Sequence, residues 1–303
     1  MKWTKRGVIY KPDGSRPWAR HSALQPTPLV LDDRIRVFVG LRDEDGVSSV
    51  GWVDLDPRDP SRVIGECEVP ALSKGLDGAF DERGVVPCAV VTVGEEVWLY
   101  YAGYQLPRSV RFFVFGGLAI SGDGGTTFAR ARRVPLLDRT DEALFFRIAH
   151  TVMRDGDLWR VWYGGGSEFR KGAEKSLPVY DIRYMESRDP LHFPEQGEVV
   201  IPVREGEHRV GRPYVIRRGS GYLMFYGAGT EHQGYRLGYA ESTDGRVWTR
   251  RDEDVGIDVS PEGWDSEMIG YPAVVTVHGR TFLFYNGNDY GKTGFGYAEL
   301  EAW

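Results

Sequence analysis

Cysteine is scarce in this sequence of 303 residues, which holds only Cys67 and Cys88. Two cysteines are too few for a disulfide framework, and we expect both to be reduced. No apolar run approaches the roughly 20 residues that a membrane-spanning helix needs. The first residues, 1–6, are followed by no apolar stretch of the kind found in signal peptides. These absences predict a soluble cytoplasmic protein with no membrane partner.

Basic charge is not in excess, since 38 Lys and Arg stand against 44 Asp and Glu and the formal net charge is −6. Without a net basic field, we expect no nucleic-acid partner. No group of His, Cys and acidic residues has a spacing typical of metal ligands, so we expect neither a metal nor another cofactor. A sustained helical period is also missing, which argues against a helical fold.

Aromatic residues and glycine are abundant, with 9 Trp, 16 Tyr, 14 Phe and 39 Gly. An apolar strand that ends in glycine recurs five times, and successive copies are 60 to 63 residues apart. The five glycines are Gly40, Gly103, Gly164, Gly227 and Gly287. An apolar strand and a polar turn precede each copy, a third strand follows, and a shorter fourth strand usually comes after it. Four antiparallel strands in each repeat are typical of a propeller blade.

The fifth repeat has no fourth strand of its own, because the sequence ends at Trp303. Segment 3–10 precedes the first repeat and offers the missing strand. We therefore predict an all-β fold, a single domain over 1–303. It is a five-bladed β-propeller with four-stranded antiparallel blades, in which the N-terminal strand closes the ring and leaves no open edge. Two β-sandwiches are the alternative, but five equal repeats do not divide into two. Segments 170–178 and 252–263 are the longest predicted loops.

Two turns, at 121–128 and 242–248, share a serine, an aspartate two residues later, glycine and a closing aromatic residue. They resemble the Asp-box turn of sialidases and the equivalent turn of furanosidase propellers. The aspartate of such a turn accepts hydrogen bonds from turn amides while the aromatic ring packs between strands. We therefore predict a structural role for both turns, on the rim of the fold.

Polar and charged residues gather where the first strand of each repeat begins. In a propeller these strands line the central channel, and their first residues face the funnel. Burying such groups without partners is costly, so we predict a polar site there. The alternative is that the charges pair with one another and hold the blades together. The residues concerned are His21, Gln25, Asp81, Arg147, His150, Arg212, Glu267 and Tyr271.

The five repeats, the Ser-x-Asp-Gly-x-x-Trp turn and the starts Arg212-Pro213 and Tyr271-Pro272 resemble the superfamily of arabinanase, levansucrase and invertase glycosidases. The resemblance covers the whole chain. Within that group, segments 21–28, 78–85, 284–288 and 294–296 are most similar to an uncharacterised glycosidase-like branch often associated with polysaccharide or sugar-conjugate biosynthesis. The superfamily implies three funnel carboxylates, which are a base or nucleophile, a positioning aspartate and an acid on the first three blades.

The match to these carboxylates is incomplete. Asp81 fits the second position, but the first repeat offers His21 and Gln25 instead of an acid. The third repeat has Arg147 and His150 at its start, and Glu168 only after its second strand. Ordinary hydrolysis by two carboxylates is therefore in doubt.

Phosphorylases of the same architecture use one carboxylate and let phosphate attack. Arg147, Arg212 and His150 match such an anion. The Glu-Asp-Pro-Arg signature expected of those enzymes is missing.

Our leading hypothesis is a carbohydrate-active enzyme that acts on a glycosidic bond of an anionic or phosphorylated sugar, either a small molecule or an oligosaccharide. Asp81 and Glu267 are the predicted acid/base pair, because they precede the strand-opening Pro87 and Pro272 by similar distances. His21 is the next candidate for proton transfer. The predicted substrate-binding residues are Gln25, Arg147, His150, Glu168, Arg212 and Tyr271.

Two other functions stay open. One is a non-catalytic module for glycans or nucleotide sugars, with Trp18 and Trp264 as stacking platforms. The other is a biosynthetic cyclase, isomerase or transferase that reuses the glycosidase scaffold, because a fold alone does not determine chemistry.

Overall fold

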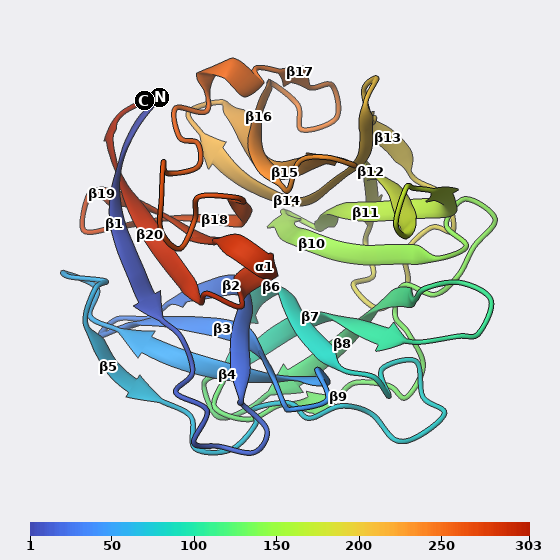
Figure 1. The fold of residues 1–303 in the computed structure, drawn as a ribbon, viewed down its shortest axis with the longest axis horizontal. Coiled ribbons are helices and arrows are strands. Elements are labelled where there is room, and N and C mark those ends of the chain that lie inside the picture. The colour runs from blue at the N-terminus through green and yellow to red at the C-terminus, as the bar shows by residue number, and fades with distance from the viewer.

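A computed structural model describes residues 1–303, and its regular secondary structure is almost entirely β-strand (Figure 1). The strands form five successive antiparallel sets. The first set holds β2 (His21–Val30), β3 (Ile35–Arg42), β4 (Ser48–Leu55) and β5 (Val63–Glu66); the second holds β6 (Val85–Val93), β7 (Glu96–Gln105), β8 (Phe113–Ser121) and β9 (Ala129–Arg130).

The remaining three sets repeat this plan. The third holds β10 (Phe146–Asp155), β11 (Leu158–Lys171), β12 (Ser176–Ser187) and β13 (Glu198–Ile201); the fourth holds β14 (Glu207–Arg218), β15 (Gly221–Thr230), β16 (Arg236–Ser242) and β17 (Thr249–Arg250); the fifth holds β18 (Gly270–Val277), β19 (Arg280–Asn286), β20 (Phe295–Ala302) and β1 (Lys2–Tyr10). Two short helices, η1 (Asp252–Asp254) and α1 (Asn288–Gly291), complete the chain.

Hydrogen bonds join the second, third and fourth sets into one sheet of 12 strands, while the first and fifth sets are separate four-stranded sheets. The pairings that connect these three sets are short. β8 and β10 are parallel over only two residue pairs, and β12 and β14 over one. The antiparallel ladders within each set are far longer. The 12-stranded sheet is therefore three sets that touch at their inner ends.

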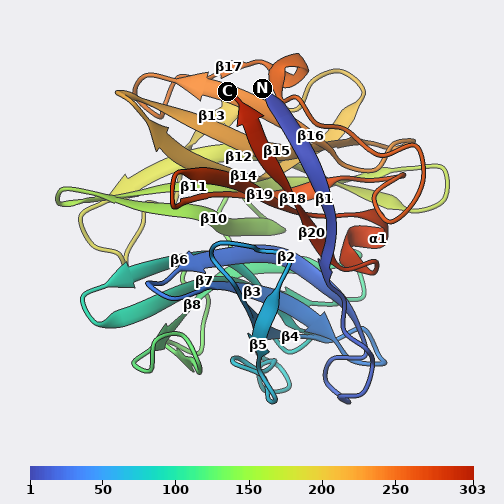
Figure 2. The same cartoon turned by 90° about the vertical axis from the view of Figure 1, so that its left-hand side faces the viewer.

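The N-terminal strand belongs to the last set. β1 pairs antiparallel with β20, from Lys2 opposite Ala302 to Tyr10 opposite Phe295. Figure 2 shows the two strands side by side and the two chain ends close together. The pairing predicted for segment 3–10 is therefore present. Trp3 of β1 is buried, and its indole nitrogen donates to the Val255 carbonyl at 2.9 Å.

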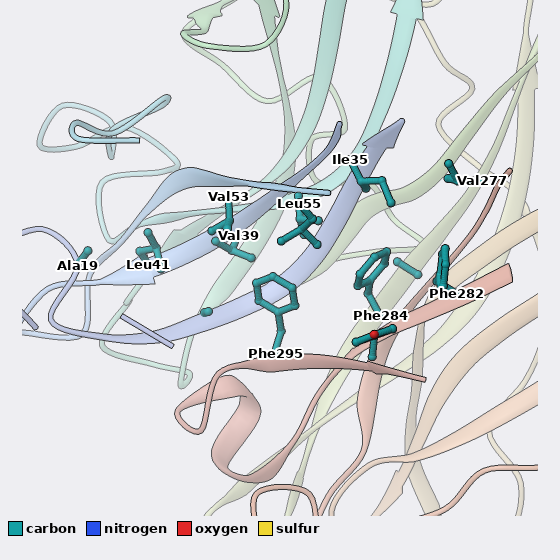
Figure 3. Close-up of a cluster of buried hydrophobic side chains, with 14 residues drawn as sticks. Ala19, Ile35, Val39, Leu41, Val53, Leu55, Val277, Phe282, Phe284 and Phe295 are labelled. Carbon is teal, nitrogen blue, oxygen red and sulfur yellow. The ribbon is translucent and has the colours of Figure 1, made fainter. Parts of the chain in front are cut away.

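The hydrophobic core is divided among the contacts between sets. Five buried clusters join the first set to the second, the second to the third, the third to the fourth, the fourth to the fifth and the fifth to the first. Figure 3 shows the last of these, where Ile35, Val39 and Leu55 face Phe282 and Phe284. A fully buried side chain of this kind contributes about 1.5–3 kcal/mol. The alternation of each strand thus supplies apolar side chains to both neighbouring sets.

Asp81 belongs to a buried contact that holds the second set together. It is 1% exposed and accepts a hydrogen bond from the Tyr101 hydroxyl at 3.1 Å. It also forms an ion pair with Nε of Arg130 at 2.7 Å. Phe80, the preceding residue, stacks on Tyr101 with ring centroids 6.0 Å apart. We call this arrangement of a buried carboxylate, a tyrosine hydroxyl and a basic side chain a clasp.

The fifth set contains the same clasp. Asp265 is 1% exposed and accepts from the Tyr285 hydroxyl at 3.1 Å and from Nζ of Lys5 at 2.7 Å. Trp264 stacks on Tyr285 as Phe80 does on Tyr101, with centroids 5.0 Å apart. The two basic residues lie at equivalent positions, because each is on the fourth strand of its set and pairs with an alanine of the third strand. Lys5 pairs with Ala298, and Arg130 pairs with Ala119. Asp81 and Asp265 therefore share one structural role.

The two Asp-box turns have the predicted structure. Asp123 accepts from the amides of Thr126 and Thr127, both at 2.9 Å. Asp244 does the same for the two amides at Arg246 and Val247.

Only one of the two segments predicted to be loops is a loop in the structure. Segment 252–263 contains no strand, whereas most of 170–178 is a hairpin, because β11 runs to Lys171 and β12 begins at Ser176. No helix of the structure has the length and apolar character needed to cross a membrane.

Candidate functional site

Every innermost strand carries a β-bulge near its start. The register shifts lie between Leu24 and Thr27 in β2, and in matching places in β6, β10, β14 and β18. A bulge releases residues from the ladder and re-aims their side chains. Figure 1 shows these five strands around the centre of the molecule. The released residues include Gln25, Cys88, His150, Arg212 and Tyr271.

Three of the released residues have a strained backbone. Gln25, Arg212 and Tyr271 have φ values of 53°, 57° and 57°, and each precedes a proline. Residues other than glycine adopt this left-handed region at a cost, and such strain is concentrated at functional sites.

Gln25 is held in place by Asn286, which is completely buried. The Asn286 side-chain amide donates to the carbonyls of Ala23 at 2.7 Å and Gly294 at 2.9 Å, and its oxygen accepts from the Gln25 amide at 2.7 Å. Asn286 thus uses its donor group and its acceptor to tie the fifth set to the first.

A pocket of about 280 Å³ lies where the bulges converge. Gln25, His150, Arg212 and Tyr271 all line it. Three further arginines also line it, namely Arg42, Arg111 and Arg209, while no aspartate or glutamate does. The lining is therefore positively charged, although the chain as a whole carries a net charge of −6.

Arg212 lies among uncharged partners. Its guanidinium donates to Oε1 of Gln25 and Oγ1 of Thr27, both at 2.8 Å, and to the carbonyls of Pro87 at 3.1 Å and Pro26 at 3.3 Å. It is 3% exposed and forms no ion pair, and burial lowers its pKa. Its positive charge is thus removed from water without a compensating negative charge, which is costly.

Arg42 and Arg209 are half-buried and form no ion pair either. The Arg209 guanidinium lies 4.2 Å from the ring centre of Tyr235 and 5.4 Å from that of Tyr290. The chain has seven buried side-chain nitrogen or oxygen atoms without a hydrogen-bond partner, and four of them belong to residues of this pocket. They are Nε of Arg42, Arg209 and Arg212 and Nδ1 of His150. Buried polar groups normally have partners, so this concentration marks the pocket as a candidate binding site.

His150 is uncharged near neutral pH. Burial, reinforced by the charge of Arg212, lowers the pKa of its imidazole well below the usual range. Gly164 lines the pocket next to it, and Nε2 and Cδ2 of the imidazole lie 3.5 and 3.7 Å from the position that a Cβ would take, which is an ordinary contact distance.

Five tyrosines line the same pocket, namely Tyr104, Tyr180, Tyr235, Tyr271 and Tyr290. Burial raises the pKa of Tyr104 to about 12 and those of Tyr180 and Tyr271 well above the usual range. All three are therefore neutral hydroxyl groups. Aromatic faces with a polar end suit a ligand such as a sugar, which has both apolar C–H faces and hydroxyls.

The structure does not bring Asp81 and Arg147 into this pocket. Asp81 is held in its clasp with Arg130. Arg147 alternates with the pocket residues Phe146 and Ile148 along β10, so its side chain points to the opposite face of the strand. There it donates to the Pro194 carbonyl, with its Nε 3.9 Å from Glu142. The predicted meeting of these two residues in one funnel is corrected accordingly.

Glu267, Glu168 and His21 lie at the periphery. Glu267 is exposed and lines a neighbouring hollow of about 310 Å³, which shares Tyr290 with the pocket. Glu168 is exposed and pairs with Arg170 at 2.9 Å. His21 is half-buried, with its Nδ1 2.8 Å from the Ser22 hydroxyl.

Neither predicted stacking tryptophan lines the pocket. Trp264 stacks on Tyr285 in the fifth clasp, and Trp18 packs against the cluster between the first and fifth sets.

Sequence reasoning missed most of the arginines and tyrosines of the lining. One signal was present, because Arg42 and Tyr104 directly follow the repeat strands and lie next to the repeat glycines Gly40 and Gly103. Residues at that end of the second strand face the same opening as the bulges. No group of three or more His, Cys, Asp or Glu side chains is arranged to hold a metal ion.

No family model matches the chain. The uncharacterised protein Rv1502 of Mycobacterium tuberculosis is 36% identical to it over 303 residues, which cover 99% of this chain and 100% of the mycobacterial protein. The chain belongs to the Rv1502 family.

Two solved structures similar to this member of the Rv1502 family are glycoside hydrolases. A glycosyl hydrolase from Bacteroides ovatus has a TM-score of 0.74 at 13% identity, covering 99% of this chain and 93% of its own. A thermostable family-43 glycoside hydrolase has a TM-score of 0.68 at 16% identity, covering 94% and 90%. The resemblance to the five-bladed propeller glycosidase superfamily is thus confirmed, at the level of fold.

Proposed function

We propose that this protein is a carbohydrate-active protein whose central pocket binds an anionic sugar. The observation that carries the proposal is the lining itself, in which four arginines and a buried histidine occur without any carboxylate. Guanidinium groups match phosphate and carboxylate in shape and charge. The five tyrosines add hydroxyls and flat faces for a sugar ring.

We further propose that the five sets are the blades of one closed five-bladed propeller, a single domain with the pocket in its funnel. Two observations support this. Each set contacts the next through a buried cluster, and one such cluster joins the fifth set to the first. In addition, β1 supplies the fifth set with its fourth strand.

Hydrolysis by two protein carboxylates does not suit this pocket. That reaction needs two carboxyl groups about 5–9.5 Å apart around the glycosidic bond. The clasp already uses Asp81, and Glu267 lines the neighbouring hollow instead. Recognition of an anionic sugar is therefore the function that the geometry supports best.

Cleavage of a glycosidic bond by phosphate is the second candidate. The glycoside hydrolase fold favours it, as does the hollow with Glu267 and Asp289 next to the cationic pocket. An oxygen of bound phosphate would form a bond to the anomeric carbon while the glycosidic C–O bond breaks. The leaving oxygen would take a proton from the carboxyl group of Glu267. Glycosides incubated with and without phosphate, followed by mass spectrometry, would reveal a sugar phosphate that forms only when phosphate is present.

Binding is tested by titration calorimetry with hexose 1-phosphates, hexuronic acids and the corresponding neutral hexoses. We expect the anionic sugars to bind and the neutral ones not to, with an affinity that falls as ionic strength rises. Arg209→Met keeps the aliphatic stem but removes the charge. Losing a charged hydrogen bond costs about 1.5–3 kcal/mol, so the affinity should fall at least tenfold.

Arg188→Met is the matched control, because Arg188 is exposed and forms no ion pair. We expect it to bind like the unchanged protein. Equal affinity for anionic and neutral sugars, or equal losses in the two arginine variants, would contradict the proposal.

A further inference from the structure

The pocket is chemically divided. Val114, Phe146 and Ile148 give it an apolar wall on β8 and β10. Arg209 and Arg212 line the pocket from β14, and Tyr271 of β18 and Tyr290 of α1 line it as well. The three wall residues offer only carbon, while the arginines and tyrosines of the lining offer charge and hydroxyl groups. Arg111 adds charge near the outer end of the wall, with its guanidinium 5.5 Å from the centre of the Phe112 ring.

The apolar wall continues outward to the rim. Phe146 is buried, whereas Phe112 and Phe169 are half-buried. The three rings contact one another, with centroids 5.6 Å apart for Phe112 and Phe146, 5.6 Å for Phe112 and Phe169, and 5.2 Å for Phe146 and Phe169. Phe112 itself lines the pocket. An apolar surface thus leads from the inner wall to partly exposed aromatic rings.

A purely polar sugar would use only one side of this pocket. Its hydroxyls would lose water against the Phe146 wall without gaining hydrogen bonds there, which is unfavourable. An apolar group in the same place gains from leaving water. The pocket volume of about 280 Å³ is at the small end for ligand sites, so such a group would extend past Phe112 toward solvent.

We propose that the ligand is an anionic sugar with an apolar substituent, an acyl, alkyl or aryl group, which packs against Phe112 and Phe146. The proposal rests on the anionic-sugar function above and adds the class of substituent. Arg209 and Arg212 draw the anion to β14, and the wall of Val114, Phe146 and Ile148 receives the substituent.

The test compares ligands that differ only in the apolar group. The probes are phenyl phosphate with methyl phosphate, and phenyl β-D-glucuronide with methyl β-D-glucuronide. We expect each phenyl compound to bind about tenfold more tightly than its methyl partner, because a ring half-covered by aromatic side chains gains roughly that factor. Phe112→Ala should remove most of this advantage and leave the affinity for methyl phosphate unchanged.

Trp303→Ala is the control, because Trp303 is a 42% exposed aromatic residue at the chain end. It should keep the full advantage of the phenyl compounds. If phenyl and methyl compounds bind equally, the substituent proposal is overturned while the anionic-sugar function stands. If neither phosphates nor glucuronides bind, the anionic-sugar function itself fails. An advantage that survives in Phe112→Ala would overturn the assigned position of the substituent.

Discussion

Replacing Asp81 by asparagine should weaken the fold and leave the affinity for ligand nearly unchanged. The sequence assigned Asp81 to an acid/base pair, and that role would imply the reverse, namely lost turnover in an intact fold. The structure changes the expectation because Asp81 is 1% exposed and lies in a clasp with Tyr101 and Arg130, outside the pocket lining. The perturbation therefore removes a structural charge.

The size of the effect follows from the two contacts. Asparagine has the same shape and can still accept from Tyr101, so that hydrogen bond survives. The 2.7 Å ion pair with Arg130 is lost, and the Arg130 side chain, which is 24% exposed, then lacks its partner. A hydrogen bond to a charged group is worth about 1.5–3 kcal/mol, and partial exposure favours the lower half of that range. We expect a loss of about 2 kcal/mol, or roughly 3 °C in melting temperature for a chain of 303 residues.

Thermal denaturation and titration calorimetry on the same samples measure both quantities. Asp265→Asn is the matched variant, because Asp265 forms the equivalent clasp with Lys5, and it should lose a similar amount. Glu95→Gln, at an exposed turn, should change neither quantity. An Asp81→Asn protein with an unchanged melting temperature and lost ligand affinity would refute the clasp and restore the catalytic assignment.

Three further changes test other parts of the structure. The pKa of His150 is lowered in the folded state, so the unfolded chain binds more protons at low pH. The free energy of unfolding should therefore be unaffected by this group above about pH 6.5 and should fall below that pH by up to about 1.4 kcal/mol per pH unit. Melting temperatures measured over a pH series should depend less on pH for His150→Gln. Asn286→Ala breaks three buried hydrogen bonds, one of them to Gln25; denaturant unfolding should show a loss of about 2–4 kcal/mol, and calorimetry a weaker ligand affinity. Lys5→Met should lower the melting temperature because it breaks a clasp, whereas Lys2→Met, at an exposed ion pair, should not.

The repeat could be recognised in the sequence because every set packs against its two neighbours in the same way. An apolar second strand is covered on both faces by neighbouring sets, so it has to be apolar along its whole length, and glycine follows where strands approach closely. Gly103 illustrates the constraint, because a Cβ there would lie 2.5 Å from the Phe80 ring. Such local demands recur in every set and leave a period of 60 to 63 residues in the sequence.

The site was harder to predict because bulges decide which side chains enter it. A one-residue change of register moves a side chain to the other face of a strand, and the prolines after Gln25, Arg212 and Tyr271 did not reveal which face each side chain takes. In β10 the shift between Ala149 and Thr151 directs His150 into the pocket, while Arg147, before the shift, points away. Both residues had been predicted to bind substrate on equal grounds.

Charge pairing was the second property that could not be inferred from the sequence. Sequence spacing treated Asp81 as a free acid, but its partner Arg130 lies 49 residues further along the chain and could not be inferred from Asp81 alone. The opposite error applies to Arg42 and Arg209, which have no acidic partner although acidic residues outnumber basic ones in the chain. A site candidate is thus identified by the charges that remain unpaired after folding, and only coordinates reveal those.

The unpaired charges also separate this pocket from the chemistry that its fold suggests. Hydrolysis between two carboxylates needs negative charge at the centre, to stabilise a positive transition state. Here Arg212 places an uncompensated positive charge at that centre, and four neutral acceptors hold it there. The same position would destabilise a positively charged sugar and stabilise a negatively charged one. The scaffold can therefore be that of a glycosidase while, under the proposed function, its centre favours ligands of the opposite electrostatic character.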